Sequence, residues 1–170
     1  MNRTCARVLP AALAVVAATT AFSPATARHP VTHRYCAVVV DKAPSRHHAS
    51  RVVTRACADS PEAAPLRTAR ADNTLLVTVY QDANYGGAQT SIYGRGGPCD
   101  SSGYSLNDTG GANSAVNGIS SYRLFSNCNK SAVFTGTGGS GTGSGVLGGD
   151  QSYVGDAWND NVNSMKVWNG

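Results

Sequence analysis

Residues 77–87 constrain the fold more tightly than any other part of the chain. They read Val-Thr-Val-Tyr-Gln-Asp-Ala-Asn-Tyr-Gly-Gly, and the first half alternates apolar and polar residues with the period of a half-buried strand. A turn-forming cluster follows at 82–84, and then Tyr85 and two glycines. A chain that bends back over its own sheet needs one residue with positive φ, which glycine adopts without strain. The stretch predicts a β-hairpin that bends at Gly87, with Tyr80 and Tyr85 packed beneath the bend.

Two later segments share a second pattern. Residues 116–121 read Val-Asn-Gly-Ile-Ser-Ser and residues 159–164 read Asn-Asp-Asn-Val-Asn-Ser, and strand-like residues follow each of them. Together with the hairpin they resemble the Greek keys of βγ-crystallins, which open on a folded hairpin. Calcium-binding members end on two Asn/Asp residues, two variable residues, Ser/Thr and Ser. The first segment departs from that motif at its first position, and the second departs at its fifth, where Asn163 replaces a hydroxyl residue.

The resemblance covers roughly residues 74–170. It implies an all-β fold in which two Greek-key motifs form a βγ-crystallin-like sandwich. The hairpin of the second repeat is less complete, because Phe134 and Gly141 match the first aromatic and the bend glycine whereas Gly139 stands at the second aromatic position. Residues 135–149 hold eight glycines in all. They read as hairpin and loop, since a phosphate-binding loop would need a helix after it.

The N-terminus reads as a secretory signal peptide over residues 1–27. Arg3 and Arg7 precede a mostly apolar run that is too short for a membrane span, and small residues at 25 and 27 suit cleavage before Arg28. We therefore expect a secreted, extracellular protein without a membrane span in the mature chain.

Four cysteines remain after the signal: Cys36, Cys57, Cys99 and Cys128. An even number in a secreted chain predicts two disulfides, with three possible pairings. Sequence neighbours favour Cys36–Cys57 and Cys99–Cys128. A zinc site is the competing interpretation, but the spacing lacks any C-x-x-C pair.

The composition changes near residue 73. All 19 glycines lie after it and all four histidines before it. We expect a basic appendage with a disulfide over 28–57, a linker over 58–73, and the Greek-key domain over 74–170. The alternative for the appendage is a disordered basic tail or pro-segment. The basic segment has a single aromatic residue, which makes nucleic-acid binding a poor interpretation.

No arrangement of residues predicts an enzyme. The histidines lie outside the β domain, so a Ser-His-Asp triad would have to span the linker, and the serines of the glycine-rich run lack the nucleophile-elbow context.

Calcium is the chemistry that the family resemblance implies. Calcium takes six to eight oxygen ligands and mixes carboxylates, carbonyls and hydroxyls. Carried over residue by residue, the better site would use Gln81, Gly118, Ser120 and Asp160. The weaker site, which has no carboxylate, would use Asn117, Thr135, Asn161 and Asn163. The purely structural alternative is that these Asx and Ser side chains bond the local backbone.

Two functions therefore remain open. The first is a secreted βγ-crystallin-like binding module, stabilised by disulfides and by weakly bound calcium. The second is a protease inhibitor or killer-toxin-like protein on the same fold, acting on an extracellular protein target. The candidate inhibitory loop is the Cys99–Cys128 loop, together with Pro98 and Asp100-Ser101-Ser102.

Overall fold

The computed structural model of the chain describes residues 34–43, 48–107, 109 and 118–170. These residues belong to one compact unit spanning 31–170. The predicted signal peptide and Asn117 lie outside the described residues.

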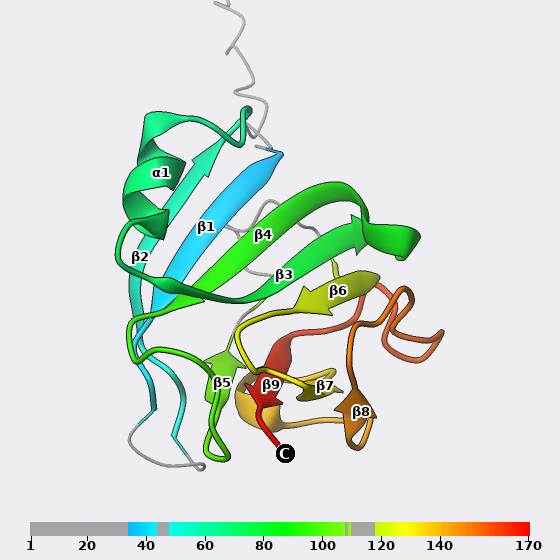
Figure 1. Cartoon of the computed structure of the whole chain (residues 1–170). Helices are drawn as coiled ribbons and strands as arrows, with labels where there is room; N and C mark the ends of the chain where they lie inside the picture. Colours follow the sequence, from blue (N-terminus) through cyan, green and yellow to red (C-terminus); the bar gives the residue numbers. More distant parts are fainter. Residues whose placement is uncertain (1–33, 44–47, 108, 110–117) are drawn as a thin grey trace, which may run out of the picture. The chain divides into compact units, whose positions relative to one another are not determined.

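Within those ranges, nine strands form two sheets (Figure 1). The five-stranded sheet has the order β2-β1-β4-β3-β6, with bounds Val52–Ala58, Tyr35–Val40, Gly86–Gly94, Thr74–Asp82 and Ser121–Leu124. The four-stranded sheet has the order β5-β9-β7-β8, with bounds Tyr104–Asn107, Ser164–Trp168, Lys130–Phe134 and Leu147–Gly148. Single turns of 3-10 helix, η1 (Ala83–Tyr85) and η2 (Thr137–Gly139), follow β3 and β7.

The two Greek keys exchange strands between the sheets. The β3–β4 hairpin is completed by β6, which returns beside β3, while β5 crosses to pair with β9 of the second repeat. The second repeat returns the exchange, because Gln151 forms an antiparallel bridge with Tyr122 of β6. This arrangement confirms the predicted all-β sandwich of two Greek-key motifs.

The N-terminal hairpin extends the first sheet. β1 pairs antiparallel with β2 and parallel with β4, so residues 35–58 continue the sheet beyond the β3–β4 hairpin. β1 is buried on both faces, since Val38 and Val40 join the core between the sheets whereas Ala37 and Val39 pack against α1. A short apolar run without alternation is typical of a strand covered on both faces.

The predicted linker over 58–73 contains the helix α1 (Ala64–Arg70). Pro65 stands in its first turn, where a missing N–H costs nothing, and Leu66 and Ala69 turn inward onto the first sheet. Leu66 is only 1% exposed. The structure therefore differs from the expected boundary at residue 73, because β1 and β2 belong to the sheet of the first Greek key and α1 packs on that sheet.

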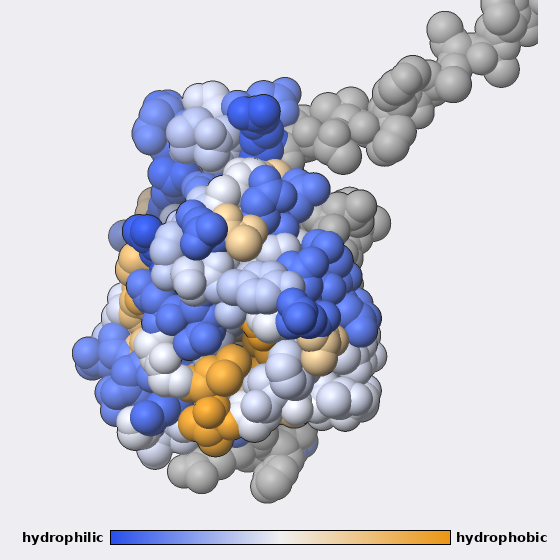
Figure 2. Space-filling model, turned by 90° about the vertical axis from the view of Figure 1, so that its right-hand side faces the viewer, coloured by the Kyte–Doolittle hydropathy of each residue, from blue (hydrophilic) through white to orange (hydrophobic). Residues whose placement is uncertain are grey.

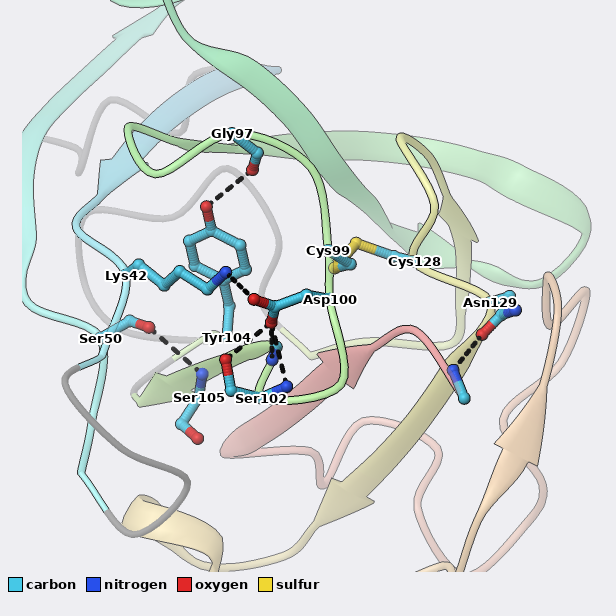
Figure 3. Close-up of a disulfide and its surroundings, with 12 residues drawn as sticks. Lys42, Ser50, Gly97, Cys99, Asp100, Ser102, Tyr104, Ser105, Cys128 and Asn129 are labelled. Carbon is cyan, nitrogen blue, oxygen red and sulfur yellow. Dashed lines mark hydrogen bonds and ion pairs between the residues drawn. A yellow bond between two sulfur atoms is a disulfide. The ribbon is translucent and has the colours of Figure 1, made fainter.

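Both predicted disulfides are present. Cys36–Cys57 joins directly opposite residues of β1 and β2, and Cys99–Cys128 ties the segment after β4 to the segment after β6 (Figure 3). Each bridge closes a loop of 20 to 30 residues, which on the chain-entropy model contributes roughly 3–4 kcal/mol.

The face of the molecule shown in Figure 2 is mostly hydrophilic. It carries one small apolar patch among polar residues. Within the described part of the chain, Val146 and Tyr153 are the large hydrophobic side chains that are exposed. No helix among the described residues has the length and apolarity needed to cross a membrane.

Candidate metal centre

The bends of the two hairpins have the same backbone conformation. In the first repeat Asn84, Tyr85 and Gly87 have φ of 56°, 66° and 74°. In the second, Gly138, Gly139 and Gly141 stand at the matching positions with φ of 66°, 77° and 75°. The structure thus confirms the two bend glycines, and it shows that Gly139 takes the left-handed conformation of Tyr85.

The last serine of each end motif fixes its hairpin. Ser121 donates to the Asp82 carbonyl at 2.6 Å and accepts from the Tyr85 amide at 3.0 Å. Ser164 donates to the Gly136 carbonyl at 2.5 Å and accepts from the Gly139 amide at 2.9 Å. Ser121 and Ser164 are 0% and 1% exposed, so each hydroxyl satisfies two backbone groups that water does not reach easily.

The structure shows two contacts that involve the predicted residues of the better site. Gly118 lies against Asp160, because a Cβ placed on Gly118 would stand 2.7 Å from Asp160 Oδ1 and 2.8 Å from Asp160 Cα. The Ser120 amide donates to the Tyr80 carbonyl at 3.0 Å, which places Ser120 beside the strand residue that precedes Gln81. Asp160 is exposed, and its Oδ2 accepts from Asn159 Nδ2 at 2.8 Å.

The backbone at this site is unusual on both sides of the contact. Gly118 has φ of 111°, and Asp160 has φ of 58°. The space between them is too small for a Cβ at residue 118, so glycine at this position allows the two end motifs to meet. The close approach puts a carboxylate of the second repeat next to a carbonyl-bearing residue of the first.

The weaker site is arranged differently. Asn163 Nδ2 donates to the Thr135 carbonyl at 2.6 Å, so the two predicted ligands satisfy each other. The Asn161 amide donates to the Trp158 carbonyl at 2.9 Å. Asn117, the fourth predicted ligand, lies outside the described residues. A side-chain amide can turn either its nitrogen or its oxygen toward a neighbour, and here the nitrogen faces the carbonyl that calcium would need.

The donor chemistry distinguishes the two sites. The better site offers a carboxylate, a hydroxyl and two carbonyls, which are ligands that calcium accepts. In the weaker site the Asn163 side-chain N–H group already occupies the Thr135 carbonyl, which calcium would need as a ligand. No group of three or more His, Cys, Asp and Glu side chains that could hold a metal occurs among the described residues. A metal site in that part of the chain would therefore combine at most two such side chains with neutral oxygens.

Hydrogen bonds from Lys42 and from the loop's own backbone hold the start of the candidate inhibitory loop in place (Figure 3). Lys42, which follows β1, donates to Asp100 Oδ2 at 2.5 Å, and Asp100 Oδ1 accepts from the amides of Ser102 and Gly103. The Lys42 ammonium and these donors hold the pKa of the Asp100 carboxyl well below its ordinary value. The backbone of the loop is also hydrogen-bonded to the fold. The Cys99 amide donates to the Ser126 carbonyl, and the Asp100 carbonyl accepts from the Asn169 amide.

Sequence reasoning missed the role of Lys42. The residue lies 58 positions from Asp100, so no local pattern links the two. The turn around Asp100 was the available signal, because an Asp followed by two serines and a glycine often caps its own backbone.

Comparisons with known proteins find only structural neighbours. No protein-family model matches the chain, and no curated protein matches it. The chain is similar to a double mutant of a βγ-crystallin domain from Clostridium beijerinckii, with 26% identity, a TM-score of 0.43, and coverage of 56% of this chain and 98% of that one. For a βγ-crystallin domain from Flavobacterium johnsoniae the values are 26%, 0.41, 56% and 96%. For the N-terminal domain of protein S they are 20%, 0.42, 55% and 96%.

Proposed function

We propose that this protein is a secreted βγ-crystallin-like binding module with one weak calcium centre. The centre is formed by the Gln81 and Gly118 carbonyls, the Ser120 hydroxyl and the Asp160 carboxylate. The observation that carries the proposal is the contact between Gly118 and Asp160, which joins the end motifs of the two repeats.

The affinity should be low. One carboxylate and three neutral oxygens leave half of the formal charge of the ion uncompensated, and water would complete the six to eight ligands. Extracellular calcium modules of this kind have Kd of about 10⁻⁴ to 10⁻³ M. Calcium bound at this position would stabilise the junction between the repeats.

Secretion and the absence of catalysis belong to the same proposal. Two disulfides in a chain of this size are typical of oxidising compartments. The four residues of the centre offer oxygen atoms suited to holding a hard cation, and the proposal assigns them no catalytic role.

Inhibition of a protease is the less favoured function. A loop that binds a protease in a substrate-like way must present its backbone groups to the enzyme. Here the Cys99 amide and the Asp100 carbonyl are already bonded within the fold, although Pro98, Asp100 and Ser101 are exposed. The geometry therefore favours the calcium module.

Thermal unfolding with and without calcium tests the proposal. Calcium that binds only the folded state adds RT ln(1 + [Ca²⁺]/Kd), which is roughly 1.4 kcal/mol at ten times Kd. In a domain of this size we expect the melting temperature to rise by several degrees in millimolar calcium relative to chelator. Asp160→Asn should remove most of that rise.

The Asp160→Asn variant is a clean probe because asparagine also tolerates the left-handed backbone found at this position. Asp156→Asn, in the same loop, makes the same change of charge and should keep the full shift. If chelator and calcium give the same melting temperature for the wild-type protein, the calcium proposal fails.

A further inference from the structure

A groove of about 480 Å³ lies on the outer face of the second sheet, beside the bend of the second hairpin. Phe134, Gly139, Ser164 and Lys166 line it from the second repeat, and Ser105 and Asn107 line it from the neighbouring strand β5. Opposite pairs in the β5–β9 register, Ser105 with Lys166 and Asn107 with Ser164, put these polar residues on one face. The volume lies within the range of small-molecule binding pockets.

In the first repeat, the position that corresponds to the groove is occupied by the side chain of Tyr85. Counted from the two bend glycines and from Ser121 and Ser164, Phe134 corresponds to Tyr80, Gly139 to Tyr85, and Lys166 to Arg123. The Tyr85 ring packs edge-on against Tyr80 with centroids 5.7 Å apart, and Arg123 Cζ stands 4.0 Å from the centre of the Tyr85 ring. An aromatic ring therefore fills the corresponding position between an aromatic floor and a cation.

In the second repeat that position is open. A Cβ placed on Gly139 would meet no atom within 4 Å, and one on Gly138 would meet only Asn107 Nδ2, at 3.9 Å. Phe134 still supplies the aromatic floor and Lys166 still supplies the cation, whose Nζ lies 5.7 Å from the centre of the Trp168 ring. The groove therefore includes the position that the Tyr85 side chain fills in the first repeat, and it extends from there toward Ser105 and Asn107 of β5.

We propose that this groove binds a small aromatic carboxylate, whose ring takes the place that Tyr85 fills in the first repeat. The ring would lie against Phe134, as aromatic pairs do. Lys166 would face either the ring or the carboxylate, since an ammonium is attracted to both. The described lining includes the Lys166 ammonium and no Asp or Glu, so its charge suits an anion. The inference is independent of calcium.

Amide chemical-shift titration of the oxidised protein tests the site, with 4-hydroxyphenylacetate as the probe. We expect saturable shifts centred on Gly138, Gly139 and Lys166. Cyclohexylacetate, which has the same charge on a saturated ring, should bind at least tenfold more weakly. Equal affinity for the two acids would overturn the proposal, as would the absence of saturable shifts at these residues.

Gly139→Tyr supplies the decisive variant. Tyrosine is accommodated at φ of 66° at the corresponding position of the first repeat, and Gly139 has φ of 77°, so the variant should fold and fill its own groove. We expect the affinity for 4-hydroxyphenylacetate to fall at least tenfold in a variant that still unfolds in one cooperative thermal transition. Unchanged affinity in a folded variant would contradict the proposal.

Lys166→Gln tests the cation separately. It should weaken binding of 4-hydroxyphenylacetate severalfold while changing the affinity for the uncharged p-cresol less. A variant that binds the acid as tightly as the wild type would exclude the proposed role of Lys166. This pattern does not arise from a general loss of structure, because an unfolded groove would lose both ligands together.

Discussion

The two Greek-key repeats share a backbone frame and differ in the chemistry that each frame supports. Both hairpins bend through left-handed residues that end in a glycine, and both are fixed by a buried serine with the same two backbone partners. The first repeat fills its bend with Tyr85, whereas the second leaves Gly139 without a side chain. Its end motif replaces a hydroxyl with Asn163, which bonds Thr135 directly.

The comparison separates two roles within one motif. The serine and the bend glycine maintain the fold of each hairpin, since both are present where the aromatic residue and the hydroxyl are absent. We propose that the aromatic at the bend and the fifth residue of the end motif determine what each repeat can bind. The second repeat therefore departs from the motif at these positions and keeps the backbone conformation of the first.

Removing the hairpin serines should have the largest effect. Ser121→Ala and Ser164→Ala each delete two hydrogen bonds and leave partly buried backbone groups without partners, at a cost of about 2 kcal/mol. We expect similar losses in urea unfolding for the two variants. A loss confined to Ser121→Ala would mean that the second hairpin does not depend on its serine, and the structural equivalence of the repeats would be refuted.

The bend glycine of the first repeat comes next. Gly87→Ala forces a Cβ into φ of 74° and to within 2.6 Å of Asp82 Oδ2, so we expect a loss of about 1–2 kcal/mol. Gly86→Ala is the matched control, because its Cβ would meet neighbours only at 3.4 Å and its φ is −94°. Thermal melts that rank the two glycines in the reverse order would contradict the hairpin geometry.

The buried Tyr122 of the first repeat should make a smaller contribution to the free energy of unfolding, and that contribution should depend on pH. Tyr122 stands where the second repeat has Met165, and burial raises its pKa from 10.0 to about 12. This contribution to stability is complete below pH 10 and is lost as the pH rises toward 12, because the unfolded chain ionises first. At pH 11 the loss should be about 1 kcal/mol.

Urea unfolding at pH 9 and pH 11 measures how much stability is lost over this pH range. Tyr122→Phe should reduce the pH dependence, although it leaves the Ser131 hydroxyl without its 2.6 Å partner and lowers stability at both pH values. The remaining dependence would come from Tyr80 and Tyr104, whose pKa values are also raised by burial. An unchanged difference between the two pH values in the variant would show that Tyr122 titrates normally.

Local sequence signals predicted the Greek-key hairpins, and nonlocal pairing explains what they could not predict. The bend at Gly87 follows from eleven consecutive residues, and the Ser-ended motifs are equally local. The parallel pairing of β1 with β4 joins segments that lie more than fifty residues apart, and neither strand carries a mark of its partner. The helix α1 was missed because it has only seven residues, within an alanine- and proline-rich stretch.

The candidate sites could likewise be predicted only in part from the sequence. The family resemblance implied that Asp160 and Gly118 would share a site, because members of that family assemble their sites by exchange between the repeats. The bond between Asn163 and Thr135 depends on which end of an amide faces a carbonyl, and a residue type alone does not decide this. The sequence identifies Gly139 as a departure from the motif, whereas only the structure shows the groove that results.

Calorimetric titration with calcium tests the unequal sites most directly. If the first frame keeps its oxygen ligands and the second has closed its own with the Asn163 amide, the wild-type protein should bind one calcium ion per chain. Asp160→Asn should then bind none in the same concentration range. Two ions bound with equal affinity, or one ion retained by Asp160→Asn, would contradict the proposed inequality of the two repeats.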